Sequence, residues 1–189
     1  EVLGNQVQLM IDANQVWEVN QAIEWVNKLQ FASPFFIEEP TSPDDVSGHK
    51  TIKNGVFPIK VATGEMCQNR IIFKQFIKED AIDIIQIDSC RMGGLNEVLA
   101  VMIMAEKYKK PVWPHAGGVG LCEYVQHISM IDYLLISCEK NSKRIEYVDH
   151  LHEHFLHPCK IMNGNYMAPL DPGFSIEMKS STLIDYLFK

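Results

Sequence analysis

The sequence predicts an α/β fold in which parallel strands close into a (β/α) barrel. Short apolar runs alternate with amphipathic segments, a pattern typical of a parallel sheet with helical crossovers. The apolar runs are nearly continuous, as in strands that are buried on both faces. Each run ends, or nearly ends, in a charged or titratable residue. In a barrel such residues meet at one mouth, whereas an open doubly wound sheet would hold those of its edge strands far apart.

Six strands and five helices are expected. The strands are residues 7–14, 35–39, 58–65, 81–88, 111–115 and 143–148. The helices between them are residues 19–30, 42–55, 68–80, 94–110 and 121–135. The first helix has its apolar residues on one stripe, which predicts one buried face. Ser42 is a candidate N-cap for the second helix, with Pro43 at its first position.

Composition limits the classes of function. The chain has 189 residues, a net charge of −7 and no basic face of the kind that nucleic acid requires. No apolar run reaches the ~18 residues of a membrane-spanning helix. Its five cysteines are odd in number and form no CxxC motif, which favours free thiols over a disulfide framework. A reactive cysteine nucleophile is the less favoured alternative.

Carboxylates end three successive expected strands. Asp12, Glu38 and Glu65 would converge at the barrel mouth, where three like charges repel one another unless a cation neutralises them. Oxygen-only ligands select a hard ion, and Mg²⁺ is the default choice. The alternative is that each acidic strand end caps a helix or faces water. Glu38 is followed by Glu39, and because strand side chains alternate, one of the two would face the mouth and the other solvent or a loop.

The next strands supply Asp88, His115 and Glu146. An aspartate beside a histidine fixes its tautomer and raises its pKa, which suits a general acid or base near neutral pH. Glu146 could hydrogen-bond a substrate oxygen. The alternatives are a structural histidine under the loop that follows His115 and a salt bridge between Glu146 and Arg144.

A histidine-rich segment offers a different class of function. His150, Glu153 and His154 match the HxxEH pattern of inverted zinc peptidases, provided that they lie on a helix. No third ligand stands out downstream. The alternative is a polar loop without a catalytic role.

Five strings together resemble the enolase superfamily, in its mandelate-racemase-like branch and nearest to its L-fuconate dehydratase group. They are MIDANQVW, FFIEEP, VATGE, QIDSCRMGG and WPHAGGVGLCEYVQH. The resemblance extends over essentially the whole chain. It implies a Mg²⁺-dependent hydro-lyase that converts an acid sugar, L-fuconate or a related aldonate, to a 2-keto-3-deoxy acid through a metal-stabilised enediolate. A mitochondrial location and a homo-oligomer are also in keeping with it.

The resemblance implies a role for each candidate residue. Asp12, Glu38 and Glu65 would be the Mg²⁺ ligands, so that Glu38 is the inward member of the pair. His115, with Asp88, would be an acid/base that helps the 3-hydroxyl leave. Glu146 would lie near the substrate carboxylate or the enolate oxygen.

One part of the family pattern does not appear. The family's second base is a lysine in a Lys-x-Lys motif on the strand before Asp12, and the first lysine here is Lys28. We therefore expect a fragment: about six of eight β/α units over residues 1–148, then residues 149–189 returning toward a capping domain that is absent. Such a chain could be inactive alone. The alternative function is a catalytically dead, truncated barrel with a regulatory or interaction role.

Overall fold

The computed structural model describes residue 4, residues 7–140 and residues 143–188. The chain divides into two compact units, Glu1–Val112 and Trp113–Lys189, and each is taken by itself below. Among the described residues, no helix is both long and apolar enough to cross a membrane.

The first unit is built on a parallel sheet. Its four strands lie in the order β1 (Met10–Asp12), β2 (Phe36–Glu38), β3 (Lys60–Thr63) and β4 (Ile84–Ile85). The expected strand over residues 111–115 adds one isolated parallel bridge, between Val112 and Ile85. The first four predicted strands are therefore confirmed, each shorter than expected.

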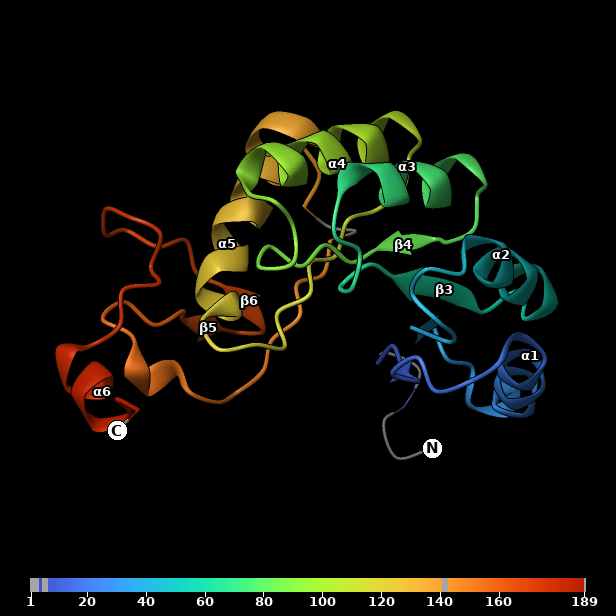
Figure 1. The fold of residues 1–189 in the computed structure, drawn as a ribbon, viewed down its shortest axis with the longest axis horizontal. Helices are drawn as coiled ribbons and strands as arrows, with labels where there is room; N and C mark the ends of the chain where they lie inside the picture. Colours follow the sequence, from blue (N-terminus) through green and yellow to red (C-terminus); the bar gives the residue numbers. More distant parts are fainter. Residues whose placement is uncertain (1–3, 5–6, 141–142, 189) are drawn as a thin grey trace. The chain divides into compact units, whose positions relative to one another are not determined.

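Helices connect these strands. They are α1 (Val19–Lys28), α2 (Val46–Gly55), α3 (Arg70–Lys78) and α4 (Leu95–Lys107). Figure 1 shows them side by side along the outer side of the sheet, in chain order. A doubly wound fold would instead place helices on both faces and would change direction within the strand order. The sequential order and one-sided helices are those of a (β/α) barrel, although the described strands do not close into a complete ring.

The start of α2 differs from the prediction. The helix begins at Val46, and its N-cap is Asp45, whose Oδ1 accepts a hydrogen bond from the Gly48 N–H at 2.7 Å. Ser42 instead accepts, through its backbone carbonyl, the Asp45 N–H at 3.0 Å in a turn before the helix. The carboxylate of Asp45 stands where it can satisfy a free N–H of the first turn, and the predicted cap at Ser42 was wrong.

The core of the first unit lies between the sheet and its helices. The fully buried side chains include Phe73 and Phe76 from α3, Ile37 from β2 and Ile84 from β4. Phe76 packs edge-on against the ring of His49, which is also completely buried. The histidine comes from α2, so this contact ties α2 to α3 through the core.

His49 gives the unit a predictable dependence on pH. Its Nδ1 lies 2.8 Å from the Asp45 carbonyl and donates to it, while Nε2 is buried without a hydrogen-bond partner. Burial lowers the pKa of His49 below 6.5, because protonation would place a charge in the core.

We expect the free energy of unfolding to fall as pH drops below about 6.5, because the unfolded chain then binds a proton that the folded chain resists. Above that pH both states are neutral and this dependence vanishes. Urea unfolding of His49→Leu at pH 7.5 and pH 5.5 checks this. Between the two pH values, the free energy of unfolding should fall less in the variant than in the wild type. An equal fall in both proteins would exclude His49 as a source of the pH dependence.

The second unit is less regular. Helix α5 (Leu121–Ile131) continues as a π-helical turn over Asp132–Ile136, close to the predicted end of this helix at 135. A short antiparallel hairpin follows, formed by β5 (Ile161–Met162) and β6 (Asn165–Tyr166), and then α6 (Ser180–Asp185).

The predicted strand over residues 143–148 was wrong, because these residues have no regular secondary structure. Ile145 and Val148 instead pack on a small apolar core around α5. That core consists of Ala116, Leu121, Cys122 and Val125. The apolar residues that suggested a strand are thus buried by side-chain packing rather than by pairing with a neighbouring strand.

Candidate functional site

Acidic residues gather on the carboxyl edge of the parallel sheet. Asp12 and Glu38 are the last residues of β1 and β2 and are register partners across the two strands. Glu65 follows the end of β3, and Asp88 follows β4. Since parallel strands end at the same edge, all four residues belong to one side of the sheet, as the sequence predicts.

The turn after β1 fixes the end of the strand at Asp12. Asp12 is exposed, and its Oδ1 accepts a hydrogen bond from the Asn14 N–H at 2.8 Å. Asn14 and Gln15 both have positive φ angles, which turn the chain away from the strand direction. One oxygen of Asp12 is therefore engaged in the turn, and its carboxylate can still accept at the other oxygen.

The two adjacent glutamates have different environments. Glu38 is partly buried at the end of β2, while Glu39 is 1% exposed and has a φ of 42°. Oε1 of Glu39 accepts a hydrogen bond from Gln15 Nε2 at 2.7 Å, and its backbone carbonyl accepts the Gln15 N–H at 2.8 Å. Glu39 therefore meets the loop after β1 and holds the turn that follows Asp12. This positioning role had no clear signal in the sequence beyond the paired glutamates.

Gly64 controls the approach to Glu65. Its φ is +146°, and a Cβ added there would lie 2.7 Å from the Gln86 carbonyl oxygen and 2.9 Å from the ring of Phe73. A side chain at this position would force the end of β3 away from β4.

We expect Gly64→Ala to destabilise the protein by about 1–3 kcal/mol, through backbone strain and the clash with Gln86. Thermal unfolding measures this loss. Gly94→Ala is a suitable control, because Gly94 also has a positive φ but nothing lies within 4 Å of its added Cβ. Equal losses of stability in the two variants would show that the positive φ angle alone, and not the close approach to the end of β4, accounts for the destabilisation.

Asp88 is held by the backbone that follows it. The residue is 9% exposed, and its Oδ1 accepts hydrogen bonds from the Cys90 N–H at 2.6 Å and the Arg91 N–H at 3.1 Å. These bonds fix the orientation of the carboxylate. The predicted pairing of Asp88 with His115 joins the two units and stays a prediction.

The second unit brings His115 and Glu146 together. Glu146 Oε2 accepts a hydrogen bond from the Ala116 N–H at 2.5 Å and lies 3.9 Å from His115 Nε2. The Gly117 N–H donates to the same His115 nitrogen at 3.2 Å. Arg144 lies over the ring of Trp113 at 5.9 Å. The loop after His115 thus places a carboxylate and an imidazole side by side, a contact that the sequence did not predict.

The HxxEH segment does not form the helix that a zinc peptidase would need. Residues His152–His154 make one 3-10 turn, and the left-handed Leu151 separates it from His150. His154 Nδ1 lies 3.3 Å from the Thr182 hydroxyl. The interpretation of His150 and His154 as ligands one helical turn apart was therefore wrong.

In the described part of the chain, a different group of side chains is placed so that it could hold a metal ion. The ligand atoms of Glu123, His152 and Cys159 all lie within 4.8 Å of one another. This group has no local signal in the sequence, because its members are 29 and 7 residues apart and only the fold brings them together.

Comparison with known proteins places the chain among characterised families. Residues 1–182 match the family model described as enolase C-terminal domain-like. An L-galactonate dehydratase of Hypocrea jecorina is 57% identical over 180 residues, which cover 94% of this chain and 40% of that protein. Mitochondrial enolase superfamily member 1 of Homo sapiens is 52% identical over 185 residues, which cover 97% of this chain and 42% of the relative.

Solved structures agree with these matches. The crystal structure of human mitochondrial enolase superfamily member 1 superposes with a TM-score of 0.93 at 53% identity, covering 95% of this chain and 41% of that one. An L-talarate dehydratase from Polaromonas sp. JS666, complexed with Mg and L-glucarate, superposes with a TM-score of 0.79 at 26% identity, covering 95% of this chain and 47% of that one. The chain therefore spans about two fifths of the length of the curated relatives named here.

Proposed function

Because this chain belongs to the enolase superfamily, through its C-terminal domain-like family, we propose that its protein is a Mg²⁺-dependent acid-sugar dehydratase. The observation that carries the proposal is the row of carboxylates on one sheet edge, in a chain that is 57% identical to an L-galactonate dehydratase. We propose a six-carbon aldonate as substrate. L-Fuconate and L-galactonate are the two leading candidates, and they differ only in the hydroxyl group at C6.

The carboxyl edge of the sheet suits Mg²⁺. Asp12, Glu38 and Glu65 offer only oxygen ligands, which are those that Mg²⁺ prefers. Asp12 and Glu38 face each other on adjacent strands, which run about 4.8 Å apart in a sheet. When bound, the ion would hold the substrate carboxylate and stabilise the negative charge that develops as the α-proton leaves.

The acid–base chemistry would belong to His115. In the proposal Asp88 pairs with the imidazole, and the backbone bonds from Cys90 and Arg91 keep the aspartate in one orientation. His115 would give a proton to the departing 3-hydroxyl, which leaves as water, and would help to protonate the enol after taking up another proton from solvent. Glu146, held by the Ala116 N–H, would bind the substrate near its carboxylate and would limit the motion of the ring of His115.

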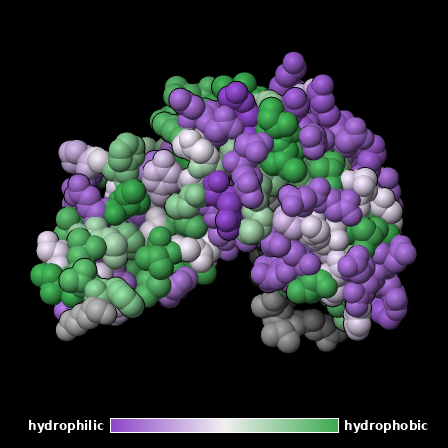
Figure 2. Space-filling model, in the orientation of Figure 1, coloured by the Kyte–Doolittle hydropathy of each residue, from purple (hydrophilic) through white to green (hydrophobic). Residues whose placement is uncertain are grey.

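The base that removes the α-proton would lie outside these residues. In the proteins that this chain resembles, this base is a lysine on a strand that precedes Asp12. Those proteins also contain two further barrel strands and a capping domain. Exposed apolar residues of this chain support the presence of these further parts, which would cover them. Val7 and Met10 are 54% and 37% exposed beside β1, and apolar side chains also lie on the surface at the C-terminal end (Figure 2), among them Leu183, Ile184 and Leu187. We propose that residues 149–189 pack on the capping domain.

Compartment and assembly are further proposals. The name of the human relative supports a mitochondrial location, and a homo-oligomer is in keeping with the family.

The test is production of 2-keto-3-deoxy acid from a panel of aldonates, with and without Mg²⁺. Two proteins are compared, the chain of residues 1–189 and a version extended upstream. We expect turnover by the extended protein only, with L-fuconate or L-galactonate preferred. No turnover of any aldonate by a folded, extended protein would overturn the proposal and favour the catalytically dead barrel.

A further inference from the structure

A cluster in the second unit combines sulfur, nitrogen and oxygen ligands. It consists of Glu123 on α5, which is buried, with His152 in the 3-10 turn and Cys159 before the hairpin, which are half-buried. We propose that these three side chains bind a structural Zn²⁺ ion, with ligands other than the carboxylates of the sheet edge. Nothing in the dehydratase chemistry uses this cluster.

The distances suit a tetrahedral ion. His152 Nδ1 lies 2.6 Å from Glu123 Oε1 and 3.8 Å from Cys159 Sγ. Bond lengths of about 2.3 Å to sulfur and about 2.0 Å to nitrogen or oxygen give ligand separations of about 3.3 to 3.6 Å in a tetrahedron. Small shifts of side chains would therefore admit the ion.

The imidazole of His152 is already oriented for a metal. Its Nε2 lies 2.8 Å from the Val148 carbonyl, which can only accept, so this nitrogen carries a hydrogen. Nδ1 consequently faces the carboxylate and the thiol. A metal-bound histidine commonly donates its other N–H to a backbone carbonyl, and Val148 supplies that partner here. Zn²⁺ would replace the proton that lies between Nδ1 and Glu123.

Glu123 is an unusual residue to find in a small apolar core. It is 1% exposed, and its Oε1 accepts the Cys159 N–H at 3.2 Å as well as the contact from His152. A buried carboxylate has to be paired or bound to a metal. Since its partners come from two later segments of the chain, an ion here would join α5, the 3-10 turn and the hairpin segment.

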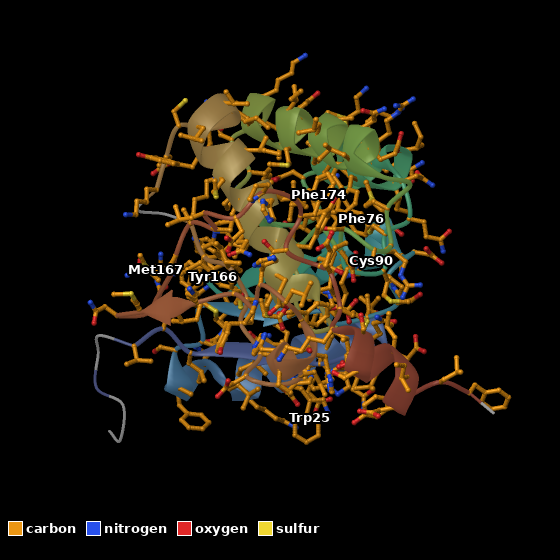
Figure 3. All side chains as sticks on the ribbon, turned by 90° about the vertical axis from the view of Figure 1, so that its left-hand side faces the viewer. Trp25, Phe76, Cys90, Tyr166, Met167 and Phe174 are labelled. Carbon is orange, nitrogen blue, oxygen red and sulfur yellow. The ribbon has the colours of Figure 1, made fainter. Side chains whose placement is uncertain are left out.

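Cys122 precedes Glu123 in the chain and lies outside this group of three. Its Sγ lies 3.6 Å from the Ala116 carbonyl oxygen and 3.9 Å from the Val148 carbonyl oxygen, so its thiol faces the backbone. The hydroxyl group of Tyr166, labelled in Figure 3, donates to the Glu146 carbonyl. The ligand set is therefore one sulfur, one nitrogen and one oxygen, which favours Zn²⁺ over Mg²⁺, because Mg²⁺ binds oxygen.

The test uses the upstream-extended protein, purified with a thiol reductant and without chelator. We expect about one zinc per chain by elemental analysis. Cys159→Ser should lose it, whereas Cys138→Ser, which changes an exposed cysteine of the same unit, should retain it. Replacement of zinc by Co²⁺ should give a thiolate-to-cobalt charge-transfer band. This band reports the ligands even if a variant folds poorly.

Thermal unfolding gives a second readout. Removal of zinc should lower the midpoint by about 5 °C or more, and added zinc should restore it. Absence of bound zinc, together with no charge-transfer band after addition of Co²⁺, would overturn the proposal. So would a Cys122–Cys159 disulfide, detected by mass spectrometry of the reductant-purified protein. Neither readout depends on dehydratase activity, so failure of one proposal does not imply failure of the other.

Discussion

Glu38→Gln is expected to lower Mg²⁺-dependent dehydration by at least about a thousandfold. The amide keeps the size of the side chain but removes the negative charge that would bind the ion. The bound ion is expected to stabilise the negative charge that develops on the substrate by several kcal/mol. The measurement is kcat/KM for 2-keto acid formation by the upstream-extended protein. Raising the Mg²⁺ concentration should recover little of the lost activity.

A matched control is Glu24→Gln, which removes the charge of an exposed glutamate that pairs with Lys28 on α1. This variant should keep full activity. If Glu38→Gln also kept wild-type activity while folding normally, Glu38 would not be a metal ligand, and the carboxylate site would have to be sought elsewhere.

Loss of the imidazole at position 115 should be nearly as severe. His115→Asn preserves hydrogen-bonding capacity toward the loop but cannot transfer a proton, so we expect kcat to fall by about 10²–10⁴-fold. The value of KM should change little, because the histidine would act on the leaving hydroxyl rather than bind the substrate.

The control is His157→Asn, which changes a partly exposed histidine of the same unit, paired with Asp171 at 3.1 Å. It should leave kcat unchanged. A decrease of similar size in both variants would point to a structural effect on the second unit and would remove the assigned acid–base role of His115.

The sequence predicted the first unit well because its signals are local and repeated. Apolar runs followed by amphipathic segments fix β1 to β4 and α1 to α4, and the acidic strand ends follow from this register. The run 143–148 misled the prediction, since Ile145 and Val148 are buried by packing against α5 rather than by strand pairing. Alternation alone cannot distinguish these two ways of burying an apolar residue.

The missed residues act through long-range contacts. Glu39 holds Gln15 from 24 positions away, and Glu123 meets His152 from 29 positions away. No local spacing links such pairs, so only the folded chain shows them. The histidine-rich segment contains an HxxEH pattern, yet its histidine that lies beside two potential ligands is His152, which is not part of the pattern.

Anomalous diffraction from crystals of the upstream-extended protein soaked in Mn²⁺, which binds the same oxygen ligands as Mg²⁺, tests the central claim most directly. We predict a single strong peak at the sheet edge, about 2.1 Å from one oxygen of each of Asp12, Glu38 and Glu65. A peak that excludes any of the three, or no peak at that edge, would contradict the account.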